Sequence, residues 1–131
     1  MTSLFTRIIK GEIPAHKILE SDKYFAFLDI RPVNPGHTLI VSRRHVADLF
    51  DLSADERDSL WALLSIVKRT LDERHSPAGY NVGANVGAAA GQTVGHVHVH
   101  VIPRYEGDVA DPRGGVRWVI PHHADYWSTR R

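Results

Sequence analysis

The chain of 131 residues contains no cysteine and only one methionine. It therefore forms no disulfide, offers no thiol nucleophile and provides no thiolate ligand for a metal ion. Any catalytic or binding chemistry must use other side chains.

A charge excess of either sign is also missing. The 16 Lys and Arg residues nearly balance the 15 Asp and Glu residues, and the formal net charge is +1. This balance gives no electrostatic reason to expect binding to nucleic acid or to an anionic membrane surface. No apolar run approaches the ~18–20 residues that span a bilayer, and the first residues lack the apolar core of a signal peptide. We therefore expect a cytoplasmic protein with neither nucleic acid nor a membrane as partner.

The residues that are present fit a folded domain. Hydrophobic residues make up 43% of the chain and charged residues 24%, which is typical of globular proteins. The length suits one hydrophobic core. We expect a single domain covering residues 1–131.

One long helix is predicted with clear ends. Ser53, followed three residues later by Glu56, fits a capping box. The apolar residues after it recur at helical spacing, at positions 60, 64, 67 and 71. Pro77 and Gly79 then end the helix.

The remaining apolar pattern predicts a short N-terminal helix and a sheet. Positions 4, 5, 8 and 9 favour a helix that ends near Gly11. Strand-like segments occupy residues 18–29 (two strands around a turn at 21–23), 37–42, 80–86 and 96–102, and residues 116–120 predict a further short strand. The predicted fold class is α+β, an antiparallel sheet of about five strands with the long helix across one face.

Nine histidines are many for this length, and three of them alternate with valines at His96, His98 and His100. On a β-strand these three imidazoles would share one face, with neighbours roughly 6.5–7 Å apart, while the valines face a core. The preceding loop, residues 87–93, consists of glycine, alanine, Gln92 and Thr93. Such small residues let a ligand approach the backbone amides closely.

Three interpretations of the histidines remain open from spacing alone. They could hold a metal ion, although the nearby sequence offers no carboxylate ligand before Glu106. A neutral imidazole could act as a nucleophile toward phosphorus, with its neighbours orienting it or binding the phosphate. The imidazoles could also simply pack in a core, which would require a hydrogen-bond partner for each.

Residues 91–102, with the pattern histidine–apolar–histidine–apolar–histidine–apolar–apolar, resemble the signature of the histidine triad (HIT) family. Residues 11–15, 29–30 and 35–37, together with Asn85, fall where members of that family place them. The resemblance implies an α+β nucleotide-binding protein, usually a homodimer, that cleaves a bond at the α-phosphate of a nucleotide without a metal or other cofactor.

The same resemblance implies a role for each site residue. His98 would be the nucleophile that carries the nucleotidyl group, His100 would bind the phosphate, and His37 and His96 would support them. Asp29 would bind the ribose hydroxyls. The phosphate and leaving group would lie along Asn85, Gln92 and Thr93. The apolar walls around the purine base would be Leu4, Phe5, Ile8, Phe27 and Ile30.

Two departures from the family pattern bear on metal and substrate. Many bacterial relatives bind zinc through two N-terminal cysteines and two histidines, but Ser3 and Thr6 stand at those cysteine positions here. Because hydroxyls are poor zinc ligands and His45 with His96 would be only half a site, we expect no structural zinc. The segment from residue 103 onward is similar to that of dinucleoside polyphosphate hydrolase-like branches.

The expected substrate is therefore a purine dinucleotide of the dinucleoside polyphosphate class. A purine nucleoside phosphoramidate is the alternative substrate, and a nucleotide-binding regulatory protein with little catalysis is the alternative function.

Overall fold

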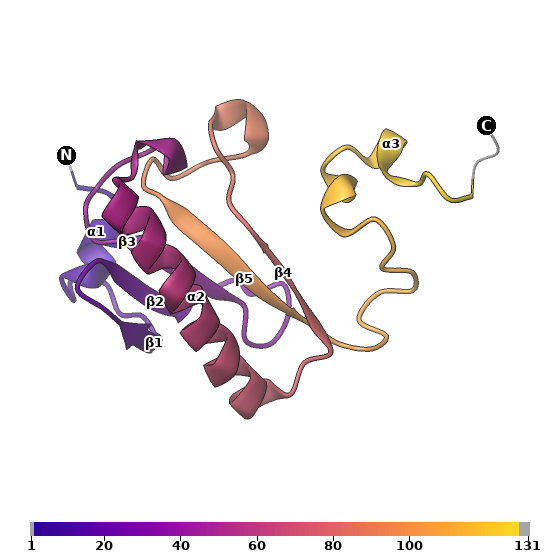
Figure 1. Ribbon diagram of the computed structural model, residues 1–131, viewed down its shortest axis with the longest axis horizontal. Helices are drawn as coiled ribbons and strands as arrows, with labels where there is room; N and C mark the ends of the chain where they lie inside the picture. The colour runs from indigo at the N-terminus through magenta and orange to yellow at the C-terminus, as the bar shows by residue number, and fades with distance from the viewer. Residues whose placement is uncertain (1, 129–131) are drawn as a thin grey trace.

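The computed structural model describes residues 2–128, and its centre is a five-stranded antiparallel sheet in the order β1-β2-β3-β5-β4 (Figure 1). The strands are β1 (Lys17–Glu20), β2 (Tyr24–Leu28), β3 (Thr38–Ser42), β4 (Gly79–Gly83) and β5 (His98–Arg104). The helices are α1 (Leu4–Ile9), α2 (Ala54–His75) and α3 (Pro121–Ala124), with 3-10 turns η1 (Leu49–Asp51), η2 (Ala88–Ala90) and η3 (Gly115–Val119). This arrangement confirms the predicted α+β class. Within residues 2–128 no helix is both long and apolar enough to cross a bilayer.

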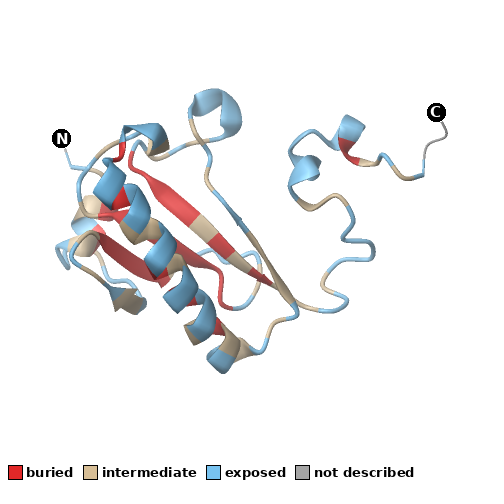
Figure 2. Ribbon diagram, viewed as in Figure 1, coloured by how far each residue is buried: buried red, intermediate tan, exposed pale blue. Residues whose placement is uncertain are grey.

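The sheet carries a hydrophobic layer on each face. Helix α2 runs across one face, where the buried side chains of Leu63, Val67 and Leu71 pack against Val99 and Val101 of β5 (Figures 1 and 2). On the other face, α1 places Phe5 and Ile8 against the apolar side chains of β2 and β3, namely Phe25, Phe27, Leu39 and Val41. A buried side chain of this size contributes about 1.5–3 kcal/mol to stability. The short helix α1 is therefore held by its packing more than by its own propensity.

The alternation along β5 divides its side chains between these two layers. Val99 and Val101 belong to the core beneath α2. His98, His100, Ile102 and Arg104 alternate with them and face the opposite side of the sheet. That side is the one covered only in part by α1, so it is open to ligands.

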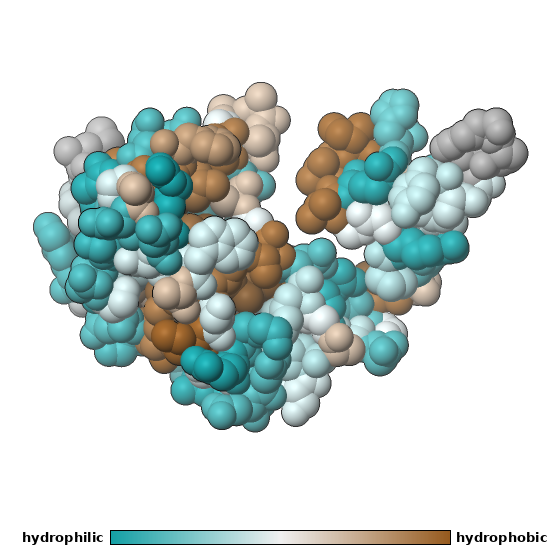
Figure 3. Space-filling model, in the orientation of Figure 1, coloured by the Kyte–Doolittle hydropathy of each residue, from teal (hydrophilic) through white to brown (hydrophobic). Residues whose placement is uncertain are grey.

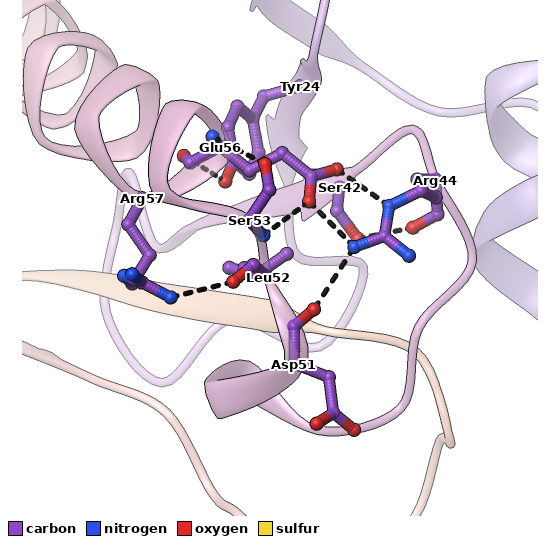
Figure 4. A network of polar contacts seen from close by, with 8 residues as sticks. All are labelled: Tyr24, Ser42, Arg44, Asp51, Leu52, Ser53, Glu56 and Arg57. Atoms are coloured by element: carbon purple, nitrogen blue, oxygen red, sulfur yellow. Dashed lines mark hydrogen bonds and ion pairs between the residues drawn. The ribbon is translucent and has the colours of Figure 1, made fainter.

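The beginning of α2 is fixed by a polar network that joins it to the end of β3 (Figure 4). Ser53 and Glu56 form the predicted capping box. The Glu56 carboxylate also accepts two hydrogen bonds from the Arg44 guanidinium, at 2.7 and 3.0 Å. These bonds, with that from the Ser53 amide, lower the pKa of Glu56 to about 2. Tyr24 donates to the Glu56 carbonyl from β2, at 2.6 Å, and completes the connection between helix and sheet.

Three local predictions differ from the structure. Strand β5 begins at His98, so His96 precedes the strand instead of lying within it. Residues 116–120 do not form a strand: Gly114 and Gly115 have φ of 95° and 49°, and the chain turns into η3. Such φ values favour glycine and end an extended segment. Trp61, whose position beside the apolar stripe of α2 predicts packing, is 71% exposed.

After β5 the chain leaves the sheet and forms a separate extension, residues 108–128, which we call the C-terminal arm. The arm carries η3 and α3 and stands on the β4 side of the sheet, away from helix α2 (Figure 1). It exposes several large apolar side chains, namely Val109, Val116, Trp118, Val119, Ile120 and Tyr126.

Candidate functional site

A cavity of about 800 Å³ opens on the sheet face that α2 does not cover. Its lining includes most of the residues expected at the site: Leu4, Phe5, Ile8, Phe27, Asp29, Ile30, Asn85, Thr93, His98 and His100. The apolar members come from α1, β2 and the segment just after β2. The polar members are His98 and His100 of β5, Asn85 and Thr93 of the loop before β5, and Asp29, which follows β2. One cavity therefore joins an apolar wall to a group of imidazoles, a carboxylate and an amide.

The three other expected residues do not line the cavity. His37 and His96 lie behind it, 3% and 0% exposed. Gln92 ties the loop together: its Oε1 accepts from the Gly87 amide at 2.9 Å, and its Nε2 donates to the Ala47 carbonyl at 2.8 Å. Each of these three side chains is hydrogen-bonded to other groups of the chain.

Sequence reasoning missed a further part of the lining. The segment between α1 and β1 contributes residues 13–16, and Leu28, Leu39, Gly91 and Val94 complete the walls. Residues 13–16 could have been found from the sequence, because residues 11–15 fall where HIT family members place a motif. Nothing local marks Leu39 or Val94, because they reach the cavity only through sheet pairing and loop placement.

His98 is held in one orientation by the backbone next to it. Its Nδ1 lies 2.8 Å from the His96 carbonyl oxygen. A carbonyl can only accept a hydrogen bond, so the ring proton sits on Nδ1 and the neutral ring has a free lone pair on Nε2. Phe5 packs edge-on against the ring, with centroids 4.9 Å apart. This is the tautomer that a nucleophilic imidazole requires.

His100 is fixed by a relay through His37. The Val33 amide donates to His37 Nδ1 at 3.1 Å, which places the proton of neutral His37 on Nε2. That Nε2 lies 2.9 Å from His100 Nδ1 and donates to it. The proton of neutral His100 is then on its Nε2, so the ring offers the cavity a hydrogen-bond donor. Asp29, whose carboxylate is 3.6 Å from His37 Nε2, borders this relay.

His96 connects the histidine segment to the start of α1. Its Nε2 donates to the Ser42 carbonyl at 2.5 Å, so its Nδ1 accepts a hydrogen bond from the Ser3 hydroxyl, also at 2.5 Å. Ser3 is the N-cap of α1, because its Oγ accepts from the Thr6 amide. The His45 ring stacks on His96 with centroids 4.7 Å apart. The carbonyl that orients His98 thus belongs to His96, whose ring is held by Ser42, Ser3 and His45.

We expect Ser3→Ala to lower the free energy of unfolding by about 1–2 kcal/mol, because it removes both an N-cap and the hydrogen bond to His96. Ser3→Thr keeps the hydroxyl and is the matched control, with stability close to that of the unmodified chain. Urea denaturation of the three proteins measures the difference. An alanine variant as stable as the threonine variant would contradict the role assigned to this hydroxyl.

Burial lowers the pKa of His37, His96 and His100 below the usual 6.5 for histidine, because desolvation penalises the charged ring. For His37 the nearby Asp29 carboxylate opposes this effect. All three rings are therefore neutral at pH 7, as the hydrogen-bond assignments above require.

These lowered pKa values predict a loss of stability in mild acid. As pH falls below about 6.5, these histidines bind protons in the unfolded chain before they do so in the folded chain. The free energy of unfolding therefore decreases from about pH 6.5 down to the lower pKa values of the folded chain. Urea denaturation at pH 7.5, 6.5 and 5.5 measures it. We expect His100→Gln to flatten this profile and His122→Gln, at an exposed position, to leave it unchanged. A profile that is flat in the unmodified chain would contradict the assignment.

Two groups of side chains bear on metal binding. Ligand atoms of Asp29, His37 and His100 lie within 4.8 Å of one another and could hold an ion. The His37 and His100 nitrogens are already joined by the 2.9 Å hydrogen bond, which an ion would have to replace. The second group lies where many relatives bind zinc and consists of Ser3, Thr6, His45 and His96. In this group the Ser3 hydroxyl donates a hydrogen bond to His96. The absence of zinc at this second position stays a prediction.

The chain resembles known proteins over most of its length. The HIT domain family model matches residues 10–107. An uncharacterized HIT-like protein of Methanocaldococcus jannaschii is 47% identical over 107 residues, covering 80% of this chain and 81% of that protein. The adenosine 5'-monophosphoramidase of Candida albicans is 43% identical over 108 residues, covering 77% and 69%. A crystal structure of a zinc-bound histidine triad family protein from Mycobacterium smegmatis is 37% identical with a TM-score of 0.77, covering 85% and 81%.

Proposed function

This chain belongs to the HIT domain family, and from that premise we propose that it is a nucleotide-binding hydrolase or transferase that cleaves its substrate at the α-phosphate through a nucleotidyl-His98 intermediate. The observation that carries the proposal is the bond from His98 Nδ1 to the His96 carbonyl, which selects the tautomer whose lone pair is on Nε2. An imidazole held in this form is a competent nucleophile toward phosphorus.

The cavity suggests how a nucleotide binds. The purine base packs between the apolar side chains of α1 and β2, chiefly Phe5, Ile8 and Phe27. The Asp29 carboxylate accepts hydrogen bonds from the ribose hydroxyls. The α-phosphate then lies against His98 and His100, with Asn85 and Thr93 beside it. This arrangement places the negative phosphate at the donors and the base in the apolar part.

The reaction proceeds in two displacements. His98 Nε2 attacks the α-phosphorus and forms an N–P bond, while the bond from phosphorus to the leaving group breaks and its electron pair departs with that group. The Nε2–H of His100 donates to a phosphate oxygen and stabilises the charge that develops there. Water or another acceptor then attacks phosphorus and loses its proton to solvent, which also protonates an amine leaving group. The N–P bond breaks, and His98 regains its lone pair. His37 acts through His100 and is a positioning residue.

Two substrate classes are compatible with this chemistry. A dinucleoside polyphosphate is the first proposal, because the segment from residue 103 onward resembles that of dinucleoside polyphosphate hydrolase-like branches. A purine nucleoside phosphoramidate is the second, because a relative 43% identical is named an adenosine 5'-monophosphoramidase. Both classes share the nucleotidyl half and differ in the leaving group.

A side-by-side assay of a diadenosine polyphosphate, an adenosine phosphoramidate and adenylyl sulfate tests this function. We expect turnover of at least one of them, chelator-insensitive and abolished by His98→Ala. A protein that binds adenosine monophosphate yet turns over none of the panel would support the alternative of a regulatory nucleotide-binding protein.

We further propose that the chain forms a homodimer. Strand β4 is at the edge of the sheet, so within residues 2–128 one of its sides has no neighbouring strand. Val82 on β4, and Trp61 and Ile66 on α2, are exposed apolar side chains. Sedimentation equilibrium should give twice the chain mass of 14.7 kDa; a mass of one chain at micromolar concentration would contradict it.

A further inference from the structure

The turn between β2 and β3, residues 30–36, carries the backbone group that sets the tautomer of His37. The Val33 amide donates to His37 Nδ1 at 3.1 Å, and the His37 amide donates to the Asn34 carbonyl, also at 3.1 Å. Residues 30–33 are exposed and belong to neither a helix nor a strand. The sheet therefore does not fix the Val33 amide directly, and the position of this amide depends on what holds the turn.

Asn34 fastens the turn to residues 103–108, at the end of β5 and just after it. Its Nδ2 donates to the Asp108 carboxylate at 2.8 Å and to the Pro103 carbonyl at 3.1 Å. The Tyr105 hydroxyl donates to the Pro35 carbonyl at 2.6 Å. Beyond this segment the C-terminal arm stands apart from the body across an open cleft (Figure 3). Residues 103–108 thus hold the turn from one short stretch of chain.

The Asp108 carboxylate that receives Asn34 is itself firmly held. Arg104 donates to Oδ2 from Nε at 2.8 Å and to Oδ1 from Nη2 at 2.9 Å, so the ion pair is bidentate. The Tyr105 amide donates to Oδ2 at 3.0 Å. These bonds, those from Arg104 above all, hold the pKa of Asp108 well below its usual range. Asn34 therefore donates to a charged acceptor whose side chain is only 11% exposed.

The other end of the turn is held by packing. Gly36 has φ of 88° and lies so close to Pro103 and His75 that a Cβ would come within 3.0–3.1 Å of their side chains. Only glycine adopts this conformation readily and fits this space. Gly36 directly precedes His37, so this packing fixes the backbone at the ring, while Asn34 fixes the backbone beside the Val33 amide.

The tautomers of His37 and His100 depend on each other. With the Val33 amide at Nδ1, His37 carries its proton on Nε2 and donates to His100 Nδ1. Without that amide, His37 can carry its proton on Nδ1, accept at Nε2 from His100, and leave His100 with a lone pair on Nε2. The Asp29 carboxylate, 3.6 Å from His37 Nε2, favours the first state. The second state would present a lone pair to a phosphate oxygen where a donor is needed.

We propose that Asn34 and Asp108 are positioning residues for the reaction. Their hydrogen bond fixes the Val33 amide, which sets the proton of His37. The Nε2–H of His100 then stays available to the phosphate. The proposal rests on the proposed function, because it concerns the donor that stabilises charge on the phosphate. Neither Asn34 nor Asp108 is among the described residues that line the cavity of about 800 Å³, so both act through His37 and not on the substrate.

The kinetic test uses whichever of the assayed nucleotides the unmodified protein turns over fastest. Asn34→Ala removes both side-chain donors, and Asp108→Ala removes their charged acceptor. We expect each to lower kcat about three- to tenfold with KM within about twofold, because the His100 donor acts on charge that develops in the transition state. Asp108→Asn keeps an oxygen for Asn34 and should recover most of the loss. Asp111→Ala is the matched control, since this carboxylate also binds an arginine, Arg113, at 2.9 Å within the arm, and kcat should not change.

Two readouts separate positioning from a general loss of structure. In a His37→Phe background, Asn34→Ala should lower kcat by less than about 1.5-fold further, because the ring through which it acts is already gone. Nitrogen-15 NMR of the histidine rings at pH 7.5 should show the lone pair on Nδ1 of His37 and His100 in the unmodified protein and in Asp111→Ala. The same signals should report a mixture of the two tautomers in Asn34→Ala.

The inference is overturned if Asn34→Ala and Asp108→Ala change kcat no more than Asp111→Ala does. It is equally overturned if the loss in Asn34→Ala multiplies with that of His37→Phe, or if the ring tautomers are unchanged in Asn34→Ala. Should Asp108→Ala unfold, Asn34→Ala carries the test, because it leaves the ion pair of Asp108 in place. Failure of the proposed function looks different: the unmodified protein would then turn over none of the substrates, and the NMR comparison would still decide the inference.

Discussion

Replacing His98 with alanine is expected to lower turnover of a nucleotide substrate by about 10³-fold or more, because it removes the nitrogen that attacks phosphorus. Affinity for adenosine monophosphate should change little, since the base and ribose contacts come from α1, β2 and Asp29. Steady-state kinetics give the first quantity and isothermal titration calorimetry the second.

His98→Gly extends this test. The smaller side chain leaves room where the imidazole stood, so imidazole added to the buffer should restore part of the turnover. His122→Gly, at an exposed position of α3, is the matched control and should be neither impaired nor stimulated. Full activity in the His98 variants would refute the nucleophile assignment.

Replacing His100 with alanine has the second largest expected effect, a loss of about 10²–10³-fold in kcat. The Nε2–H of His100 is a preorganised donor, because its tautomer is set by the 2.9 Å bond from His37. A donor of this kind stabilises charge that grows in the transition state, so kcat should fall more than KM rises.

His37→Phe separates the relay from the donor. It keeps the ring volume and removes the bond to His100, which is then free to place its proton on either nitrogen. We expect a loss in kcat smaller than that of His100→Ala, with little further loss when both substitutions are combined, because the two residues act as one unit. Losses that simply multiply in the double variant would contradict the relay.

The fold was predictable where the signals are local. The capping box at Ser53 and Glu56 and the apolar stripe of α2 lie within one helix, so the sequence contains all the information that sets them. The alternation of valine and histidine along β5 similarly predicts which face each takes. Residues 116–120, which are apolar except for Arg117, were predicted as a strand, but they follow two glycines whose positive φ values turn the backbone.

The candidate site was predictable as a set of residues but not as a geometry. The family resemblance supplied the expected roles of His98 and Asp29, and both residues line the same cavity. The tautomers of the histidines depend on the His96 carbonyl, the Val33 amide and the Ser42 carbonyl, which are backbone groups without a sequence signal. The contact between Ser3 and His96 joins residues 93 positions apart.

The central claim is a covalent bond between the nucleotide and His98, and the most direct measurement is mass spectrometry of the protein quenched during turnover. The account predicts an intact mass increased by one nucleoside monophosphate residue, located on His98 by peptide fragmentation, stable in alkali and lost in acid. His98→Ala should show no such adduct. A substrate that is turned over with no adduct on the chain at any quench time, or with an adduct on another residue, would contradict it.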